Sequence, residues 1–330
     1  MITVKGRKLR KRRRNSGWAV LLAVLGLISC LVVATFLLRY SERPARPVQV
    51  AAVDRPASAQ PPQPPVPPSR IHAVEELRSG VLDISEARAG TEGVMVFDPY
   101  SGETVTLNAE RRFIAASLSK LSVLLTLYRA AARGEVDLDE EISMRPSDIW
   151  ASGTGVLYTY PVGYTMTLRE CAKFMIKESD NTAELMLNRY LGRDRIEAEL
   201  HRIGADSTSY WHPTNTTTPN DVLLVLKAIA NPSYTTPELS EDMLMLMTNT
   251  SFEDRLPGPL PEGIRVAHKI GSYESTFSDA GIIFPEEGGG TAQEYYIIVF
   301  CEGTTEGEAR GTIQDISLAA YRTLSRSDVH

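Results

Sequence analysis

The sequence predicts an α+β domain over residues 70–330, in which both chain ends build one antiparallel sheet and an all-helical lobe is inserted between them. Three observations predict this fold. A helical period and two short strand-like runs open the domain, helical periods fill its middle, and three strand-like runs and a last helix close it. With 330 residues, 43% of them hydrophobic, the chain can bury a substantial core.

Apolar residues at helical spacing define the helices, and the glycine at 134 ends the second one. The expected helices cover residues 70–88, 117–134, 168–177, 182–204, 223–230, 238–249 and 312–324. Runs rich in Val, Ile, Phe and Tyr define the strands. The expected strands cover residues 93–98, 103–107, 265–272, 279–284 and 294–300. Residues 98–102 form the turn between the first two strands, and residues 150–157 form a loop.

The N-terminal segment has the pattern of a membrane anchor. Residues 1–16 are strongly basic, and residues 17–38 contain no charge and are long enough to span about 30 Å of hydrocarbon. Because basic flanks stay in the cytoplasm, we expect a single-pass protein of the cell membrane with everything after Arg39 outside. A cleavable signal peptide is disfavoured by the length of the apolar run. Cys30 as the lipidated residue of a lipoprotein is a second alternative.

Residues 39–69 are rich in proline and have no helical or strand period, which indicates a semi-extended polyproline spacer. Its expected role is reach from the membrane, and composition leaves open a site for a partner that binds proline-rich segments. The net charge of -6 combines a basic N-terminus with an acidic remainder, which argues against nucleic acid as a partner. The pattern does not indicate an oligomeric state.

Cysteine and histidine spacing gives no metal-binding pattern among five His and three Cys. Cys171 and Cys301 lie in apolar stretches typical of buried small residues. A disulfide between them is compatible with an exported domain, but the sequence does not establish it.

Ser117 and Lys120 stand three positions apart at the start of a helical period, so both side chains should leave one face of the first turn. A lysine held out of water can accept a serine proton, and a helix N-terminus stabilises negative charge. Taken alone, the pair favours a capping serine followed by a surface lysine, because two common residues at this spacing recur by chance. Two further stretches favour catalysis: Ser179, Asp180 and Asn181, then Lys269, Ile270 and Gly271.

In this order the three motifs resemble those of penicillin-recognising serine enzymes, specifically the class A β-lactamase-like family. The resemblance extends from residue 70 to residue 325 and includes similar segments at 153–157, 167–170, 216–219 and 279–281. It implies the sheet with an inserted helical lobe that the element order also predicts. It implies no cofactor.

The resemblance also implies a role for each motif residue. Ser117 would attack a carbonyl, Lys120 would take its proton, and Ser179 would pass a proton to the leaving nitrogen. Asn181 would bind the side-chain amide of the substrate and orient Lys120, and Lys269 would supply positive charge near Ser179 and the substrate carboxylate. The backbone N–H groups of Ser117 and Ser272 would hold the oxyanion, and Gly271 is expected among the substrate-binding residues.

Asp180 is expected to be structural, bonding the backbone around the second motif. A purely structural role is the alternative for the second and third motifs: a capped turn at residues 179–181 and a lysine at a strand edge.

Two positions depart from the family pattern. Ile270 stands where a Thr or Ser hydroxyl helps to bind the substrate carboxylate, so we expect weaker or altered recognition that Ser272 offsets in part. Residues 205–219 are short and contain no Glu to activate a deacylating water. His212 stands at that place if residues 211–213 correspond to the family's Trp-Glu-Pro, and the alternative is an exposed turn histidine.

The sequence therefore predicts an exported, membrane-anchored serine hydrolase that forms an acyl-enzyme at Ser117 with a β-lactam or a D-Ala-D-Ala-type cell-wall peptide. The absence of a Glu to activate the deacylating water favours a close alternative, a penicillin-binding, DD-peptidase-like enzyme with slow deacylation. A non-catalytic envelope protein that binds ligands on the same fold is the alternative from another class.

Overall fold

The computed structural model describes residues 66–210, 215–285 and 293–325. The predicted anchor, residues 39–65 of the proline-rich spacer, Cys30 and the segment with His212 lie outside the described residues. The last two residues of the expected spacer are helical rather than semi-extended, because the first helix of the domain begins at Pro68. Within the described ranges, none of the helices combines the length and the apolar character needed to cross a membrane.

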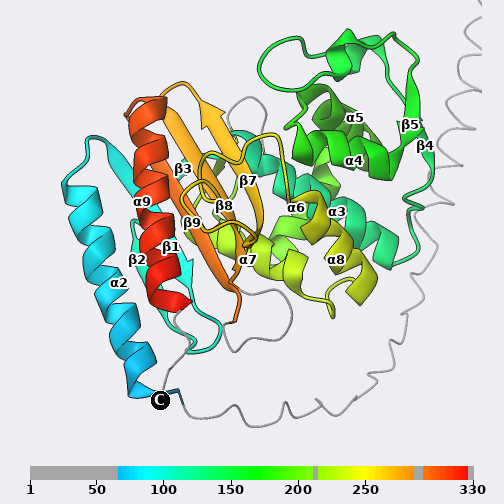
Figure 1. The fold of residues 1–330 in the computed structure, drawn as a ribbon. Coiled ribbons are helices and arrows are strands. Elements are labelled where there is room, and N and C mark those ends of the chain that lie inside the picture. The colour runs from blue at the N-terminus through cyan, green and yellow to red at the C-terminus, as the bar shows by residue number, and fades with distance from the viewer. Residues whose placement is uncertain (1–65, 211–214, 286–292, 326–330) are drawn as a thin grey trace, which may run out of the picture. The chain divides into compact units, whose positions relative to one another are not determined.

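The central sheet has the predicted composition from both chain ends. Its strands run in the order β2-β1-β9-β8-β7, and every neighbouring pair is antiparallel. They are β1 (Thr91–Phe97), β2 (Thr104–Leu107), β7 (Arg265–Tyr273), β8 (Thr276–Phe284) and β9 (Tyr295–Glu302). β1 follows the first helix, whereas β9 precedes the last, so the first and last strands of the chain meet in the middle of the sheet (Figure 1). β7 is the edge strand next to the helical lobe.

Two long helices cover one face of the sheet, namely α2 (Pro68–Glu86) and α9 (Glu306–Leu324) (Figure 1). They pack side by side because Val74 and Leu77 of α2 share one core cluster with Ile313 and Ile316 of α9. All four side chains are at most 2% exposed. This layer supports the sheet from behind.

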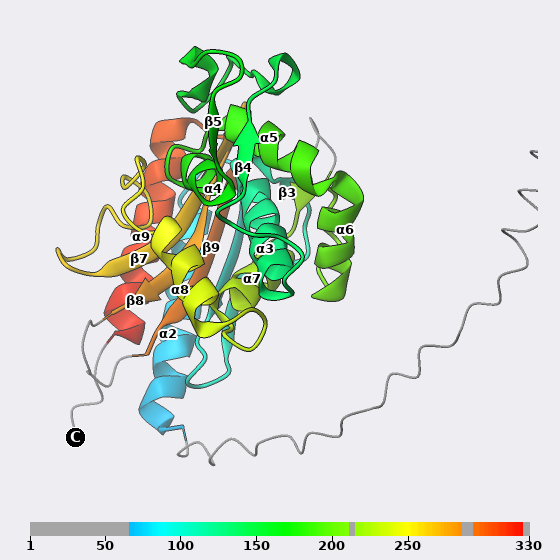
Figure 2. The same ribbon diagram turned by 90° about the vertical axis from the view of Figure 1, so that its right-hand side faces the viewer.

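The opposite face carries the predicted, mainly helical lobe (Figure 2). Its helices are α3 (Ser119–Ala132), α4 (Leu168–Lys177), α5 (Asn181–Leu191), α6 (Arg193–Arg202), α7 (Pro219–Ala230) and α8 (Pro237–Leu246). α3 is the central helix, because eleven of its fourteen residues are buried. A helix buried almost all round is typical of a core element rather than an amphipathic surface helix.

Short elements that the apolar periods did not predict complete the lobe. Two small antiparallel pairs join β3 (Phe113–Ile114) to β6 (Thr216–Thr217) and β4 (Glu141–Ser143) to β5 (Thr165–Thr167). Three 3₁₀ turns are η1 (Ala116–Leu118), η2 (Pro146–Asp148) and η3 (Leu157–Thr159).

Three predicted helices differ from the observed ones by four residues or more. The helix expected over residues 223–230 begins four residues earlier, because Thr218 caps α7 and Pro219 is its first residue. The helix expected over residues 182–204 is two helices, because Gly192 adopts φ +80° and breaks it between α5 and α6. The last helix begins at Glu306 rather than at 312, because Thr305 and Glu308 form a capping box at its start. The disulfide left open by the sequence is not formed: Cys171 and Cys301 are free and lie in separate core clusters.

Candidate active site

Ser117 lies in the 3₁₀ turn η1, and Lys120 is the second residue of α3. The turn is entered through Ala116, whose φ of +47° is costly for a residue with a side chain. Lys120 is 1% exposed, and its Nζ lies 2.8 Å from Ser117 Oγ. The predicted contact between the hydroxyl and the amine is therefore formed. Ser117 is half-buried, in the 3₁₀ turn that directly precedes α3.

The second motif is held at the start of α5. Asp180 caps this helix by accepting from Ala183 N, and its other oxygen accepts from Val156 N and Leu157 N at 2.6 and 2.8 Å. The predicted structural role of Asp180 is confirmed by these three bonds. The cap directs Asn181 toward α3, where its Oδ1 accepts from Lys120 Nζ at 2.8 Å.

Lys269 brings the third motif to the second. This side chain is 1% exposed, and its Nζ donates to Ser179 Oγ and to Ile270 O, both at 2.9 Å. Ser179 has φ +52°, a second strained backbone position at the site. Burial, followed by the charge of Lys120, holds the pKa of Lys269 well below its ordinary value. Lys269 is therefore harder to protonate than an exposed lysine.

Strand alternation sets the direction of the Ser272 backbone. His268 N donates outward from the sheet, to Met247 O at 2.9 Å, and the register with β8 is continuous from Arg265 to Tyr273. Every second residue of a strand directs its N–H to the same side, so the N–H of Ser272 also points to the outer edge of β7. η1 lies at this edge: a Cβ on Gly271 would come within 3.0 Å of Ala115 O. Gly271 thus permits the close approach.

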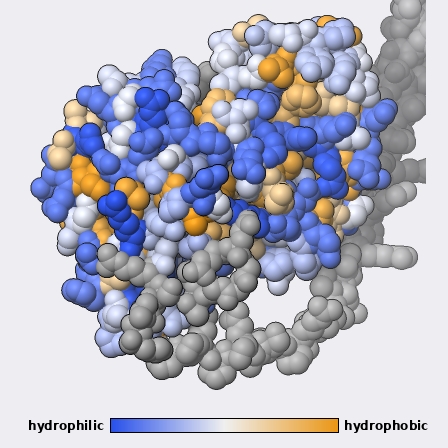
Figure 3. Space-filling view, in the orientation of Figure 1, coloured by the Kyte–Doolittle hydropathy of each residue, from blue (hydrophilic) through white to orange (hydrophobic). Residues whose placement is uncertain are grey.

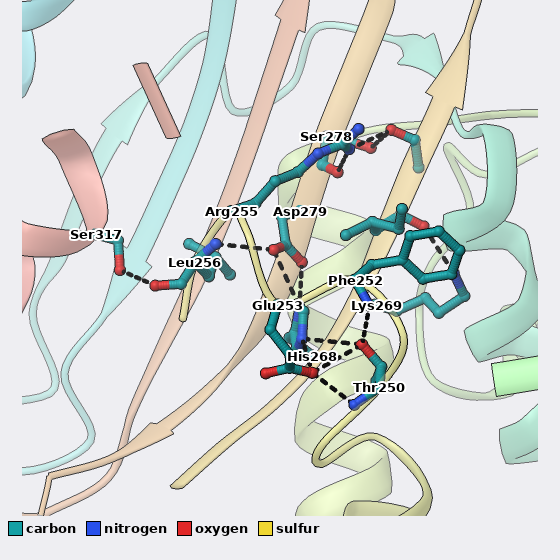
Figure 4. Close-up of polar contacts among 12 residues, drawn as sticks. Thr250, Phe252, Glu253, Arg255, Leu256, His268, Lys269, Ser278, Asp279 and Ser317 are labelled. Carbon is teal, nitrogen blue, oxygen red and sulfur yellow. Dashed lines mark hydrogen bonds and ion pairs between the residues drawn. The ribbon is translucent and has the colours of Figure 1, made fainter. Parts of the chain in front are cut away.

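Arg255, which the sequence interpretation did not single out, stabilises the end of β7. Its guanidinium donates to Gly271 O, Ser278 O and Ser272 Oγ at 2.9, 2.7 and 2.6 Å. It is 3% exposed (Figure 4). The buried guanidinium fixes the backbone and hydroxyl next to the third motif.

A buried acid-base cluster lies on the face of β7 opposite to Lys269 (Figure 4). His268 is fully buried, its Nδ1 is 3.0 Å from Asp279 Oδ1, and its Nε2 is 3.3 Å from Glu253 Oε1. Burial lowers the pKa of His268, but the charge and hydrogen bonds of Asp279 and Glu253 outweigh it and raise the pKa to about 9. Asp279 also accepts from Leu256 N at 3.0 Å, which ties the loop before β7 to the sheet.

A pocket of about 300 Å³ opens beside these motifs. Its lining includes Ser119, Asn181, Glu184 and Ser272, and Trp150 and Tyr273 contribute aromatic rings that are 39% and 45% exposed. The face in Figure 3 is mostly hydrophilic, with smaller hydrophobic patches both on the side of α2 and α9 and over the helical lobe.

The structure brings together every site residue predicted within the described ranges, whereas His212 lies outside them. Ile270, where the family hydroxyl is missing, is only 7% exposed and pairs with Asp279. Sequence reasoning missed Glu184, a carboxylate 3.3 Å from Lys120 Nζ. Its only sequence signal is its place one helical turn after Asn181.

An antiparallel sheet with an inserted helical lobe, and a serine in contact with a buried lysine at their junction, define a serine hydrolase of the acyl-enzyme type. Residues 76–324 match the Beta-lactamase2 family, described as the beta-lactamase enzyme family. The chain belongs to this family.

Known relatives agree with this membership. A β-lactamase from Bacteroides uniformis is 25% identical over 281 residues, covering 77% of this chain and 93% of the relative. The crystal structure of a β-lactamase from Sphaerobacter thermophilus is 29% identical, with a TM-score of 0.68, and the match covers 76% of this chain and 97% of that one. A mutant of PBP-A, solved as an acyl-enzyme complex with penicillin G, is 25% identical, with a TM-score of 0.69 and coverages of 80% and 98%.

Proposed function

We propose that the protein is acylated at Ser117 by β-lactams, with Lys120 as the immediate acceptor of the serine proton. The observation that supports this most directly is the 2.8 Å contact between Lys120 Nζ and Ser117 Oγ in a site where Lys120 is 1% exposed. The oxyanion would be stabilised by the N–H groups of Ser117 and Ser272, both at the meeting point of η1 and the β7 edge. Similarity to the PBP-A acyl-enzyme with penicillin G supports the same chemistry.

Ser179 would donate a proton to the leaving nitrogen, and Lys269, 2.9 Å away, would replace it. The substrate carboxylate would lie toward Lys269 and Ser272, whose hydroxyl is fixed by Arg255. Because burial and Lys120 lower the pKa of Lys269, an arriving carboxylate would favour its charged form. Asn181 would bind the side-chain amide of the substrate.

A second candidate function is acyl transfer from D-Ala-D-Ala-type cell-wall peptides with slow deacylation. The specific observation that favours it is the absence of Glu from residues 205–219 in the sequence. A long-lived acyl-enzyme would be the product of fast acylation and a poorly activated water. A non-catalytic binding protein is disfavoured by the contacts that join all three motifs.

The test is intact-mass spectrometry of the purified protein mixed with penicillin G and sampled over time. We expect a mass increase equal to one penicillin, absent in Ser117→Ala. A short-lived adduct indicates β-lactamase turnover, and a persistent one indicates the peptidase-like enzyme. A folded wild type that never gains mass, or labelling that survives in Ser117→Ala, would refute acylation at Ser117.

We also propose that the domain is held outside the cell membrane by residues 17–38, with residues 39–69 as a spacer. The basic flank, the uncharged run and the proline-rich composition support this topology. Protease added to intact cells or spheroplasts should release the domain. A protected domain would contradict the topology, and a mature N-terminus at Cys30 would replace the anchor with a lipoprotein.

A further inference from the structure

Glu184 is a buried carboxylate that the family motifs do not include. It lies on α5, is 8% exposed, and places Oε2 3.3 Å from Lys120 Nζ. Its other oxygen, Oε1, lies 3.1 Å from both Ser119 Oγ and Tyr210 OH. Burial of a carboxylate costs free energy unless the charge is paired, so the contact between Glu184 and the site lysine needs an explanation.

The contacts of Lys120 provide that reason. Among the described residues, its Nζ has three oxygen neighbours, which are Ser117 Oγ, Asn181 Oδ1 and Glu184 Oε2. Three acceptors match the three hydrogens of an ammonium group. An ammonium cannot accept the Ser117 proton until it has passed one of its own to another group.

We propose that Glu184 is the proton acceptor behind Lys120, in a relay that rests on the proposed acylation at Ser117. As Ser117 Oγ attacks the carbonyl carbon, its proton moves to Lys120 Nζ while Lys120 gives a different proton to Glu184 Oε2. The Oγ–H bond, one N–H bond and the carbonyl π bond break, and the Oγ–C bond, a new N–H bond and an O–H bond form. Lys120 remains an ammonium, Glu184 becomes neutral, and the negative charge moves to the tetrahedral oxygen.

The surroundings of Glu184 satisfy both of its charge states. While it is charged, Ser119 and Tyr210 can donate to Oε1. Once it is neutral, both hydroxyls have alternative acceptors, because Ser119 Oγ lies 2.9 Å from Ala116 O and Tyr210 OH lies 2.8 Å from Asn188 Oδ1.

Three ionisable groups act on Glu184 from neighbouring elements: Lys120 on α3, Lys269 on β7 and Tyr210 before β6. Burial, followed by the charge of Glu184, raises the pKa of Tyr210 well above its ordinary value, so Tyr210 stays a hydroxyl donor. Lys269 already donates to Ser179 and Ile270. Among these groups, Glu184 alone combines contact with Lys120 Nζ and a carboxylate oxygen that can accept its proton.

The test compares the acylation rate constants of full-length wild type and Glu184→Gln with penicillin G, by rapid quench and intact mass, from pH 6 to 9. Gln keeps the shape and the contact with Lys120 but cannot accept a proton. We expect a loss of about 10²-fold or more at pH 7, the usual contribution of a proton acceptor, with little change in the concentration for half-maximal rate. The variant rate should rise steeply with pH, because Lys120 must lose its proton to water.

Glu199→Gln is the matched control. Glu199 is 6% exposed on α6 and bonds Tyr234 and Arg202, so its replacement makes the same chemical change in a buried carboxylate away from the site. It should acylate at the wild-type rate. Glu184→Asp, which keeps the acid but shortens it by one methylene, should recover part of the rate and the flatter pH profile.

An acylation rate of Glu184→Gln within threefold of wild type across this pH range would overturn the relay while leaving acylation at Ser117 intact. A wild type that is never acylated would instead refute the proposed function. If Glu184→Gln does not fold, the relay is tested on the wild type by measuring its acylation rate in mixtures of H₂O and D₂O. Because the relay moves two protons together, we expect the rate to depend on the deuterium fraction along a curve. A straight line would overturn the relay.

Discussion

The buried cluster around His268 should make the stability of the domain fall between neutral and alkaline pH. His268 has its pKa raised to about 9 against an ordinary value of 6.5. A raised folded-state pKa stabilises the fold fully below the unfolded-state value, and the contribution is lost as pH rises through the folded-state value. At about 1.36 kcal/mol per pKa unit, the shift corresponds to about 3 kcal/mol, lost between roughly pH 6 and pH 9.5.

The assay is urea denaturation, followed by tryptophan fluorescence, at half-unit steps across that pH range. His268→Gln removes the titrating group, while its amide can still bond Asp279. The free energy of unfolding of the wild type should fall by about 3 kcal/mol more than that of the variant across the range. A loss of this size is a large part of the total stability of an ordinary domain, about 5–15 kcal/mol.

The comparison with the variant removes the titrations of other groups, which both proteins share. Parallel pH curves for wild type and His268→Gln would show that the pKa of His268 is the same in the folded and the unfolded protein, and would refute the argument. A wild type that gains stability on going from pH 6 to 9.5 relative to the variant would contradict its sign.

Two further predictions concern the strand edge and the short loop. Gly271→Ala should lower the free energy of unfolding by about 1–3 kcal/mol and should also slow acylation. The reason is that the new Cβ would lie 2.5 Å from Ser278 Oγ and 3.0 Å from Ala115 O. Equal acylation rates of wild type and variant in stopped-flow assays would contradict the close approach of β7 and η1. His212→Ala should slow deacylation by roughly 10²-fold, and wild-type turnover should fall below about pH 6, if His212 is the base. Equal deacylation rates would make His212 a turn residue.

Local and periodic features were predictable from the sequence. The contact between Ser117 and Lys120 follows from a three-residue spacing at a helix start, and the family resemblance of the three motifs indicated which distant segments meet. The break at Gly192 and the capping box of Thr305 and Glu308 were also visible as residue types, but apolar periodicity outweighed them in the prediction.

Features that depend on distant pairing were not predictable. Glu184 meets Lys120 across 64 positions of sequence, and its neighbours on α5 look like an ordinary helix start. Arg255 lies in a stretch without a regular period, and only the fold brings it against Ser272 and Ser278. No local rule of spacing reports such contacts, because they are set by how α5 and the loop before β7 pack.

The geometry of β7 explains why an isoleucine at position 270, where the family pattern has Thr or Ser, leaves the arrangement of the site unchanged. Alternation along the strand directs Lys269 into the helical lobe, while His268 and Ile270 share the opposite face, where Ile270 is opposite Asp279. On that face Ile270 is 7% exposed, so an apolar side chain is accommodated at little cost. The hydroxyl that the family pattern expects there has a counterpart two residues later, in Ser272, which Arg255 fixes at 2.6 Å. Recognition of a substrate carboxylate should therefore depend on the Arg255 and Ser272 pair rather than on position 270.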